Sequence, residues 1–313
     1  MTTNQVISVS APGKVILAGE HAVVHGFQGI WAAVEKRTTV SVQPVDQGLK
    51  IISNHSSVDH IEKGIVKFGE ILGKDVANLK ISVASDVPVG SGMGSSAALA
   101  VALSGALIKY YHQPWELERI NEIAFEIEKI KHGKPSGGDN MVASYGGFLK
   151  FWKEKDGSPK FERITKYRKI ENLIVIDSGK PKEGTKEMVD KVDELYKRNR
   201  TQISSIFSRM EQIALEFYGY LTMKSEIQVG ELFRENHRLL REIQVVSPHA
   251  EEMIKKIEHA GGAAKISGAG GFLEGSGILL AFHDEPELLL RLAESEGWSV
   301  IPVTLGAEGV RLE

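Results

Sequence analysis

The chain has 313 residues, enough for one large domain or two ordinary ones whose buried cores need no covalent staples. It contains no cysteine, so disulfides, cysteine-ligated zinc and thiol catalysis are excluded. Its 38 basic residues nearly balance its 41 acidic residues, and the net charge of −3 gives no electrostatic reason to expect binding to nucleic acid or to a membrane surface.

Two features bear on where the chain acts. Its first residues lack a basic start followed by an apolar run, so no secretory signal peptide is expected. The longest apolar stretch, residues 97–108, is interrupted by Ser104 and Gly105 and falls short of the ~20 residues that a membrane span needs. We therefore expect a cytoplasmic protein without a membrane partner.

The first half of the chain mixes strands and helices. Strands are predicted where β-branched residues alternate with others, and helices where apolar residues recur every three or four positions. The predicted strands are residues 6–9, 38–45, 79–83 and 147–152, and the predicted helices are residues 61–72, 95–111 and 115–130.

The second half is dominated by long helices. The predicted helices are residues 185–220, 228–244 and 247–260, and the predicted strands are residues 173–177, 278–282 and 299–303. The polar stretch at 160–172 separates the two patterns, so we predict domains at 1–168 and 169–313. Because strands and helices do not alternate regularly, the pattern indicates an α+β fold.

The strongest local signal is the glycine-rich segment at residues 87–98, which follows a predicted strand and opens an apolar helix. Its alternating glycines allow close backbone approach and positive φ angles. Ser95 and Ser96 stand at the helix start, where free N–H groups and the helix dipole favour an anion. The segment predicts a phosphate cradle or, alternatively, a glycine turn with a serine cap. It matches neither the Walker nor the dinucleotide-binding spacing.

A second segment, residues 11–26, sets charged side chains among small apolar ones. Pro12-Gly13 predicts a turn, after which Lys14 could steady developing phosphate charge. Glu20 and His21 could contact a polar substrate. As an alternative, the lysine lies on the surface and the histidine is a satisfied core residue.

The third segment, residues 128–140, ends a predicted helix and runs into a turn rich in proline and glycine. Asp139 there could accept a proton from a hydroxyl, or simply cap a helix. Glu128 could ligate Mg²⁺ together with a serine hydroxyl, or be an exposed helix charge. A fourth segment, residues 264–277, is a second glycine-rich loop that could close over phosphates or be an ordinary turn.

Together, these four segments resemble the GHMP kinases, the superfamily that includes the galactose, homoserine, mevalonate and phosphomevalonate kinases. Within it, residues 11–26, 132–140 and 144–147 are most similar to the members that phosphorylate mevalonate. The likeness continues through residues 236–240, the loop after Lys265 and residues 306–309, so it covers nearly the whole chain.

The resemblance implies a two-domain GHMP kinase fold. Its N-terminal domain would be ribosomal-protein-S5-like α/β and bind ATP, and its C-terminal domain would be ferredoxin-like α+β with added helices. The resemblance also implies ATP as co-substrate, with the phosphate-loop positions matching Ser85, Gly90, Ser91, Gly92, Met93, Gly94, Ser95 and Ser96.

The resemblance likewise implies the remaining site residues. Ser96 and Glu128 match the family's Mg²⁺ ligands, and Asp139 matches its catalytic base. Lys14 matches the lysine beside that base and the transferring phosphoryl group. On the substrate side, the matching positions are Glu20, His21 and Thr185.

The implied reaction is transfer of the ATP γ-phosphate to the 5-hydroxyl of (R)-mevalonate, giving 5-phosphomevalonate and ADP for isoprenoid biosynthesis, by an enzyme that is a homodimer. One alternative is a sister kinase that acts on a phosphomevalonate or on the 3-hydroxyl of mevalonate. Basic residues on the substrate side would favour that alternative, and Lys180 and Lys182 are candidates. Another alternative is a nucleotide-binding protein without catalysis.

Two positions depart from the family pattern. Gly138 stands where a bulky aliphatic residue is usual, which could loosen the placement of Asp139. The loop at 268–277 carries extra residues, including larger ones, which could change how it closes over a substrate.

Overall fold

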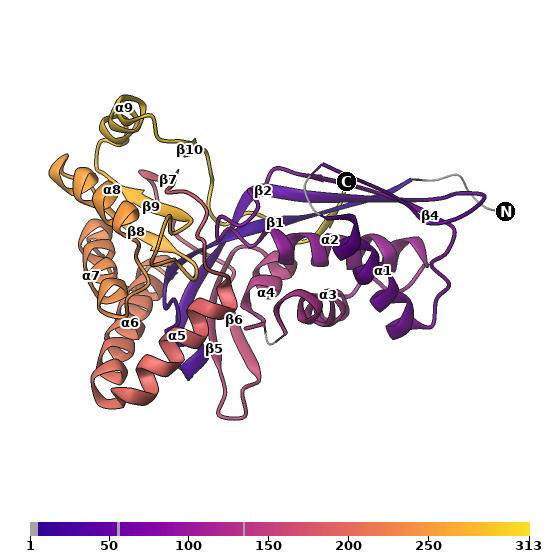
Figure 1. Cartoon of the computed structure of the whole chain (residues 1–313), viewed down its shortest axis with the longest axis horizontal. Coiled ribbons are helices and arrows are strands. Elements are labelled where there is room, and N and C mark those ends of the chain that lie inside the picture. Colours follow the sequence, from indigo (N-terminus) through magenta and orange to yellow (C-terminus); the bar gives the residue numbers. More distant parts are fainter. Residues whose placement is uncertain (1–5, 55–56, 134) are drawn as a thin grey trace.

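The structure is a computed structural model that describes residues 6–54, 57–133 and 135–313, so Lys134 of the third segment lies outside it. Figure 1 shows an elongated molecule in which the N-terminal elements occupy one end and most of the C-terminal elements the other. Both contain helices and strands, which confirms the predicted α+β class. No helix in the described ranges is long and apolar enough to cross a bilayer.

The first unit is built on a sheet of seven strands with the order β11–β1–β2–β4–β3, to which β5 and β6 are added beside β2. These strands are β1 (Ile7–Ala18), β2 (Gly29–Pro44), β3 (Lys50–Ser53), β4 (Leu79–Ser85), β5 (Phe148–Lys153), β6 (Pro159–Ile164) and β11 (Arg311–Leu312). All pairs are antiparallel except β3 with β4.

Four helices cover one face of this sheet, below the strands in Figure 1. They are α1 (Val58–Leu72), α2 (Ser95–Tyr110), α3 (Leu117–His132) and α4 (Gly138–Tyr145). Helix α2 lies in the middle of the layer and is buried along most of its length, as its almost wholly apolar sequence requires.

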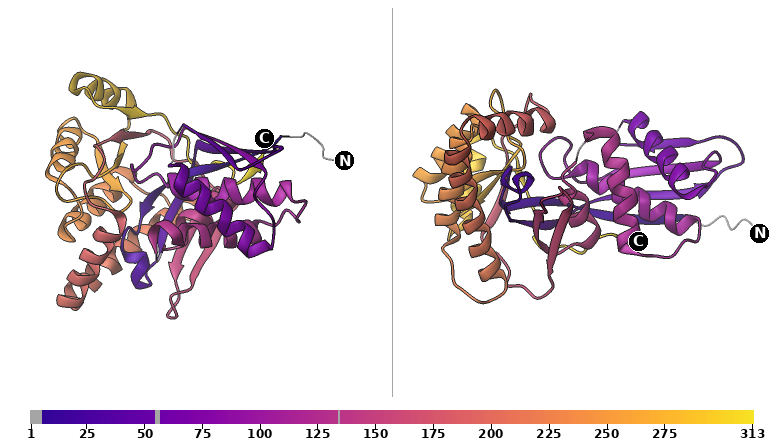
Figure 2. Two further views of the ribbon diagram at one scale, coloured as in Figure 1. Left: turned by 45° about the vertical axis from the view of Figure 1, so that its right-hand side comes forward. Right: turned by 90° about the horizontal axis from the view of Figure 1, so that it is seen from below.

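The second unit has a four-stranded antiparallel sheet with the order β10–β7–β9–β8. Helices α7 and α8 pack on β8, and Figure 2 shows α6, α7 and α8 side by side at this end of the molecule. The elements are β7 (Leu173–Asp177), α5 (Thr185–Arg198), α6 (Arg200–Leu221), α7 (Val229–Glu242), α8 (Pro248–His259), β8 (Ala263–Ser267), β9 (Ile278–Phe282), α9 (Pro286–Glu296) and β10 (Val300–Ile301).

The two units share one apolar core. The end of β1 and the start of β2, which stay paired with each other in the first sheet, pack against α6, so that Val15 and Leu17 are buried in the same cluster as Phe207 and Phe217. At the end of the chain, β11 returns to the first sheet and pairs with β1. The predicted division at residue 168 falls between β6 and β7 and stays a prediction.

Several predicted elements were wrong in extent. Pro12-Gly13 is not a turn but lies inside β1, where a shift of register absorbs the irregularity. Residues 185–220 form two helices that meet at Asn199, whose φ of −129° and ψ of 51° are not helical. Strands β3, β6, β8 and β11 and helices α4 and α9 were not predicted, because all but α9 are eight residues or shorter and carry little periodic pattern.

Candidate active site

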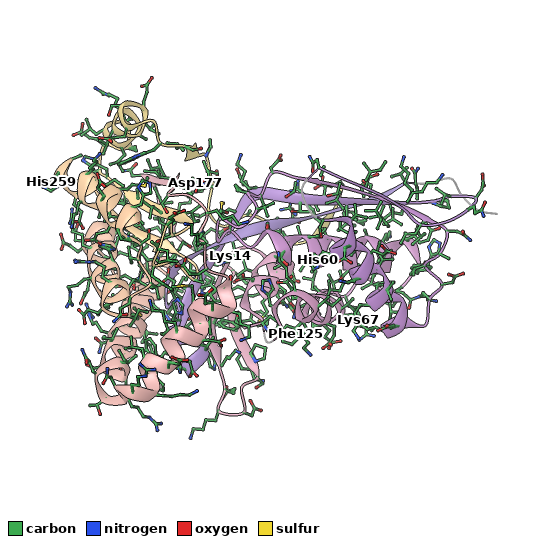
Figure 3. All side chains as sticks on the ribbon, in the orientation of Figure 1. Lys14, His60, Lys67, Phe125, Asp177 and His259 are labelled. Carbon is green, nitrogen blue, oxygen red and sulfur yellow. The ribbon has the colours of Figure 1, made fainter. Side chains whose placement is uncertain are left out.

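A cavity of about 440 Å³ opens where the two units meet, and the four segments singled out in the sequence surround it. The first unit contributes Lys14, the phosphate loop, Glu128 and Asp139, and the second contributes residues 180, 181 and 183–186 and the loop after β8. Figure 3 shows Lys14 at this junction. The fold therefore brings residues from both halves of the chain to one opening.

The glycine-rich segment forms a loop between β4 and α2 that presents the start of α2 to the cavity. The N-cap of α2 is Gly94, with a φ of 73°, and no side chain caps the helix. Its first backbone N–H groups are therefore left for a ligand, which argues against a serine cap and for an anion cradle. A Cβ atom at Gly94 would lie 2.9 Å from the side chain of Lys14, so only glycine fits this close approach.

Lys14 and Asp139 meet in the cavity. Lys14 lies on β1, is 4% exposed and donates its backbone N–H to the carbonyl of Met93 at 2.9 Å. Its Nζ lies 3.4 Å from Oδ1 of Asp139, which stands in the first turn of α4. The N-cap of that helix is Gly137, so Asp139 is not the cap, and its carboxylate faces a cation instead.

Trp31, which was not among the residues predicted from the sequence, packs next to the Lys14–Asp139 pair. Trp31 on β2 is 2% exposed, and a Cβ atom at Gly138 would lie only 1.5 Å from its Cζ3. Nζ of Lys14 lies 5.8 Å from the centre of the Trp31 ring, within cation–π range. The indole thus fills the space that an aliphatic side chain at position 138 would take, so glycine there does not leave a void beside Asp139.

Ser96 and Glu128 form a second pair of polar side chains that line the cavity. Ser96 Oγ donates to Oε1 of Glu128 at 2.5 Å, from the first turn of α2 to the last turn of α3. Burial raises the pKa of Glu128 to about 7, against the hydrogen bond from Ser96, which lowers it. The Glu128 carboxylate is buried and lies next to a hydroxyl group. A hard cation such as Mg²⁺ could bind to these two oxygens, because it needs few protein ligands when phosphate and water oxygens complete its coordination.

The substrate candidates Glu20 and His21 do not line the cavity. Glu20 is fully buried in an ion pair with Lys265 of β8, and Nδ2 of Asn236 donates to its Oε2 at 3.2 Å. The Nε2 atom of His21 is 3.0 Å from the carbonyl oxygen of Ala269, and burial lowers the pKa of the imidazole to about 4, so it is neutral at pH 7. Glu20 therefore joins the segment after β1 to β8 and α7, and His21 joins the same segment to the loop after β8.

The other predicted site residues divide between the cavity and its supports. Thr185 lines the cavity at the start of α5. Ser85 and Met93 do not: Ser85 Oγ pairs with Thr38 Oγ at 2.7 Å, and the Met93 side chain is buried in the core. The remaining predicted phosphate-loop positions all line the opening, namely Gly90, Ser91, Gly92, Gly94, Ser95 and Ser96.

A second hollow of about 380 Å³ adjoins the first and shares Val89, Ser95, Ser96 and Lys131 with it. Its other lining residues come from α1, the segment before it and the end of α3, and include His60, Lys63 and Ile130. Within the described residues there is no group of three or more acidic or histidine side chains that could hold a metal alone, whereas Ser96 and Glu128 place one hydroxyl and one carboxylate side by side.

The sequence matches two family models, described as GHMP kinases N terminal domain over residues 59–148 and GHMP kinases C terminal over residues 223–287. It is 35% identical over 268 residues to a mevalonate kinase of Archaeoglobus fulgidus, covering 84% of this chain and 88% of that protein. It is 30% identical over 341 residues to a mevalonate kinase of Thermococcus sibiricus, covering 98% of both.

Solved structures give the same picture. The crystal structure of L. major mevalonate kinase in complex with R-mevalonate superposes with a TM-score of 0.83 at 25% identity, covering 98% of both chains. That of the Methanococcus jannaschii mevalonate kinase superposes with a TM-score of 0.80 over 97% of this chain; at 22% identity, that likeness concerns the fold alone.

Proposed function

Since the chain belongs to the GHMP kinase family, we propose that it transfers the γ-phosphoryl group of ATP to the 5-hydroxyl of (R)-mevalonate, giving 5-phosphomevalonate and ADP for isoprenoid synthesis. The observation that carries the proposal is the Lys14–Asp139 pair, which lies in one cavity with an uncapped, glycine-led helix start. The similarity to mevalonate kinases over nearly the full length of the chain supports the choice of acceptor.

Asp139 orients the acceptor hydroxyl and takes its proton as the bond from the hydroxyl oxygen to the γ-phosphorus forms and the bond from that phosphorus to the bridging oxygen of ADP breaks. A positioned base of this kind contributes about 10²–10⁴-fold to the rate. Lys14, held against the carboxylate at 3.4 Å, places a positive charge where the transferring phosphoryl group carries its negative charge. The indole of Trp31 and the backbone of Gly138 keep both groups in position.

The nucleotide phosphates bind to the free N–H groups at the start of α2, with Ser95 and Ser96 at the opening. Ser96 and Glu128 would hold Mg²⁺, which would neutralise part of the negative charge of the phosphate groups. The adjoining hollow, lined in part by Ile130 and Val89, offers the base and sugar a partly apolar surface. Ser85 and Met93 act by holding the backbone of the loop.

Thr185 contacts the acceptor directly, because it lines the cavity on the side of the second unit. His21 and Glu20 act indirectly: His21 through its contact with the loop after β8, and Glu20 through its ion pair with Lys265. Of the two lysines that suggested the sister-kinase alternative, Lys182 is paired with Glu274 at 2.5 Å and does not line the cavity, so it offers no free charge to a second phosphate. Lys180 does line the cavity, so the assay of acceptors includes both phosphorylated forms of mevalonate.

The test is ADP release from MgATP against mevalonate, 3-phosphomevalonate, 5-phosphomevalonate and homoserine, followed by phosphorus NMR of any product. Formation of a 5-phosphate from mevalonate alone is the expected result. Turnover only on a phosphorylated acceptor, or a phosphate on the 3-hydroxyl, would contradict the proposed acceptor. ATP binding without turnover on any of the four would favour a nucleotide-binding protein without catalysis.

Two further parts of the proposal concern the enzyme in the cell. We propose a homodimer, on the strength of the family resemblance, and sedimentation of the purified chain tests this. We also propose a cytoplasmic location, because the reaction consumes ATP and the chain has no cysteine with which to form structural disulfides. Fractionation of the source cells tests the location.

A further inference from the structure

The phosphate loop has a lysine side chain at each end. At Gly94, the Cγ, Cε and Cδ atoms of Lys14 lie 2.9, 3.4 and 3.7 Å from the point where a Cβ atom would stand. At Gly90, the Cε, Cδ and Cγ atoms of Lys180 lie 3.0, 3.3 and 3.5 Å from the corresponding point. The aliphatic part of each lysine side chain therefore lies against one glycine of the loop.

Lys180 differs in its surroundings from the lysines near it in sequence. Lys182 forms an ion pair with Glu274, and Lys186 forms an ion pair with Asp190, one helical turn later. For Lys180 there is no carboxylate within ion-pair distance among the residues that the structure describes, although the side chain lines the cavity. Its charge is therefore available to an anion in the opening.

The backbone that carries Lys180 is fixed to the loop before β9. Ser178 Oγ donates to the carbonyl of Gly277 at 2.7 Å, and the N–H of Gly277 donates to the carbonyl of Gly179 at 3.0 Å. The first residue of β9, Ile278, donates its N–H to the carbonyl of Ser91 in the phosphate loop at 2.9 Å. Lys180 is thus held beside the phosphate loop by hydrogen bonds, before any ligand binds.

A second attachment lies three residues further along the chain. The carboxylate of Glu183 is buried, and its Oε1 accepts the backbone N–H groups of Phe272 and Leu273 at 3.3 and 2.9 Å. These two residues belong to the loop that departs from the family pattern. The backbone of this loop is therefore hydrogen-bonded to the segment that carries Lys180.

We propose that Lys180 binds the β- and γ-phosphates of the nucleotide, as a second cation on the opposite side of the phosphate loop from Lys14. This inference rests on the proposed use of ATP. Phosphoryl transfer depends on the positioning of the reacting groups and on positive charge around the phosphoryl oxygens. A lysine supplies that charge as a compact ammonium group on a flexible side chain. Because Lys14 belongs to the first unit and Lys180 to the second, the triphosphate is held by both units at once.

The experiment is calorimetric titration of the purified chain with MgATP and, separately, with AMP, in the absence of any acceptor. The proteins compared are the wild type, Lys180→Met, Lys180→Arg and, as the matched control, Lys182→Met. Loss of one charged contact to phosphate predicts about ten- to hundredfold weaker MgATP binding in Lys180→Met. AMP binding is expected to be unchanged, since AMP lacks the β- and γ-phosphates, and Lys180→Arg should keep most of the affinity.

Four results would overturn the inference: unchanged MgATP affinity in Lys180→Met, an equal loss for AMP, an equal loss in Lys182→Met, or a wild type that binds no MgATP. Lys180 is exposed, so its replacement removes no core contact, and the thermal midpoint should match that of the wild type. The proposed function is tested separately. A wild type that binds MgATP through Lys180 but phosphorylates no mevalonate would contradict the proposed acceptor and leave this inference standing.

Discussion

Replacing Gly138 by alanine would place a methyl group inside the indole of Trp31. The new Cβ atom would lie 1.5 Å from Cζ3 and 2.0 Å from Cη2, distances at which the two groups cannot coexist. The indole cannot easily retreat, because it is 2% exposed and stacks on Phe151 with ring centres 4.6 Å apart. The backbone of α4 must therefore move, and Asp139, the next residue, moves with it.

The expected loss of folding stability follows from how closely the side chains pack around Gly138. Adding a methyl group to a close-packed site typically costs about 1–3 kcal/mol, and we expect the upper end here because backbone rather than a flexible side chain must shift. Shortening Trp31 to leucine removes the obstacle but leaves a partial cavity, which also costs about 1–3 kcal/mol by the usual large-to-small scale. In the double variant, the methyl group enters that cavity, so we expect a favourable coupling of about 1–3 kcal/mol.

The assay is a double-mutant cycle with Gly138→Ala and Trp31→Leu, measuring the free energy of unfolding in urea and kcat for each of the four proteins. Gly138→Ala should lower both quantities, and the double variant should recover part of both. Gly184→Ala is the control for stability, because its φ is −76° and no atom lies within 4 Å of its added Cβ. Strict additivity, or a Gly138→Ala protein with wild-type stability and turnover, would refute the reasoning.

Three further predictions concern the buried and catalytic charges. Asp139→Ala should lower kcat by about 10²–10⁴-fold with an unchanged circular dichroism spectrum, and near-normal turnover would remove the assignment of the base. Lys265→Met leaves the buried carboxylate of Glu20 without its partner and should lower the free energy of unfolding in urea by about 3–5 kcal/mol. Adding Glu20→Gln to the same chain should restore part of that free energy. A double variant with no recovery would argue against a coupled pair. Because burial raises the pKa of Glu128 to about 7, its carboxyl group keeps its proton to a higher pH than an ordinary glutamate does, and it must lose that proton to bind a cation. The affinity for MgATP should therefore fall as the pH drops below 7, and calorimetry in two buffers of different ionisation enthalpy should detect proton release in the wild type but not in Glu128→Gln.

The local features of this protein could be predicted from its sequence. Strands β4, β7 and β9 and helices α1, α2 and α8 arise from patterns contained within short windows, and Ser247 caps α8 at 3.2 Å as its position before a proline suggests. The phosphate loop is equally local, because alternating glycines and the helix that follows them specify its backbone. The order of the four segments along the chain identified the family before any geometry was known.

The contacts between distant segments were decided only by the tertiary structure. Nothing near Glu20 in the sequence indicates that Lys265 neutralises it, and nothing near Gly138 indicates that Trp31 fills the space beside it. The same holds for Lys180, whose place beside Gly90 separates it from the neighbouring Lys182. Periodicity and turn chemistry act over a few residues, whereas which side chains meet across a cavity depends on how whole elements pack, and that packing is a property of the complete chain.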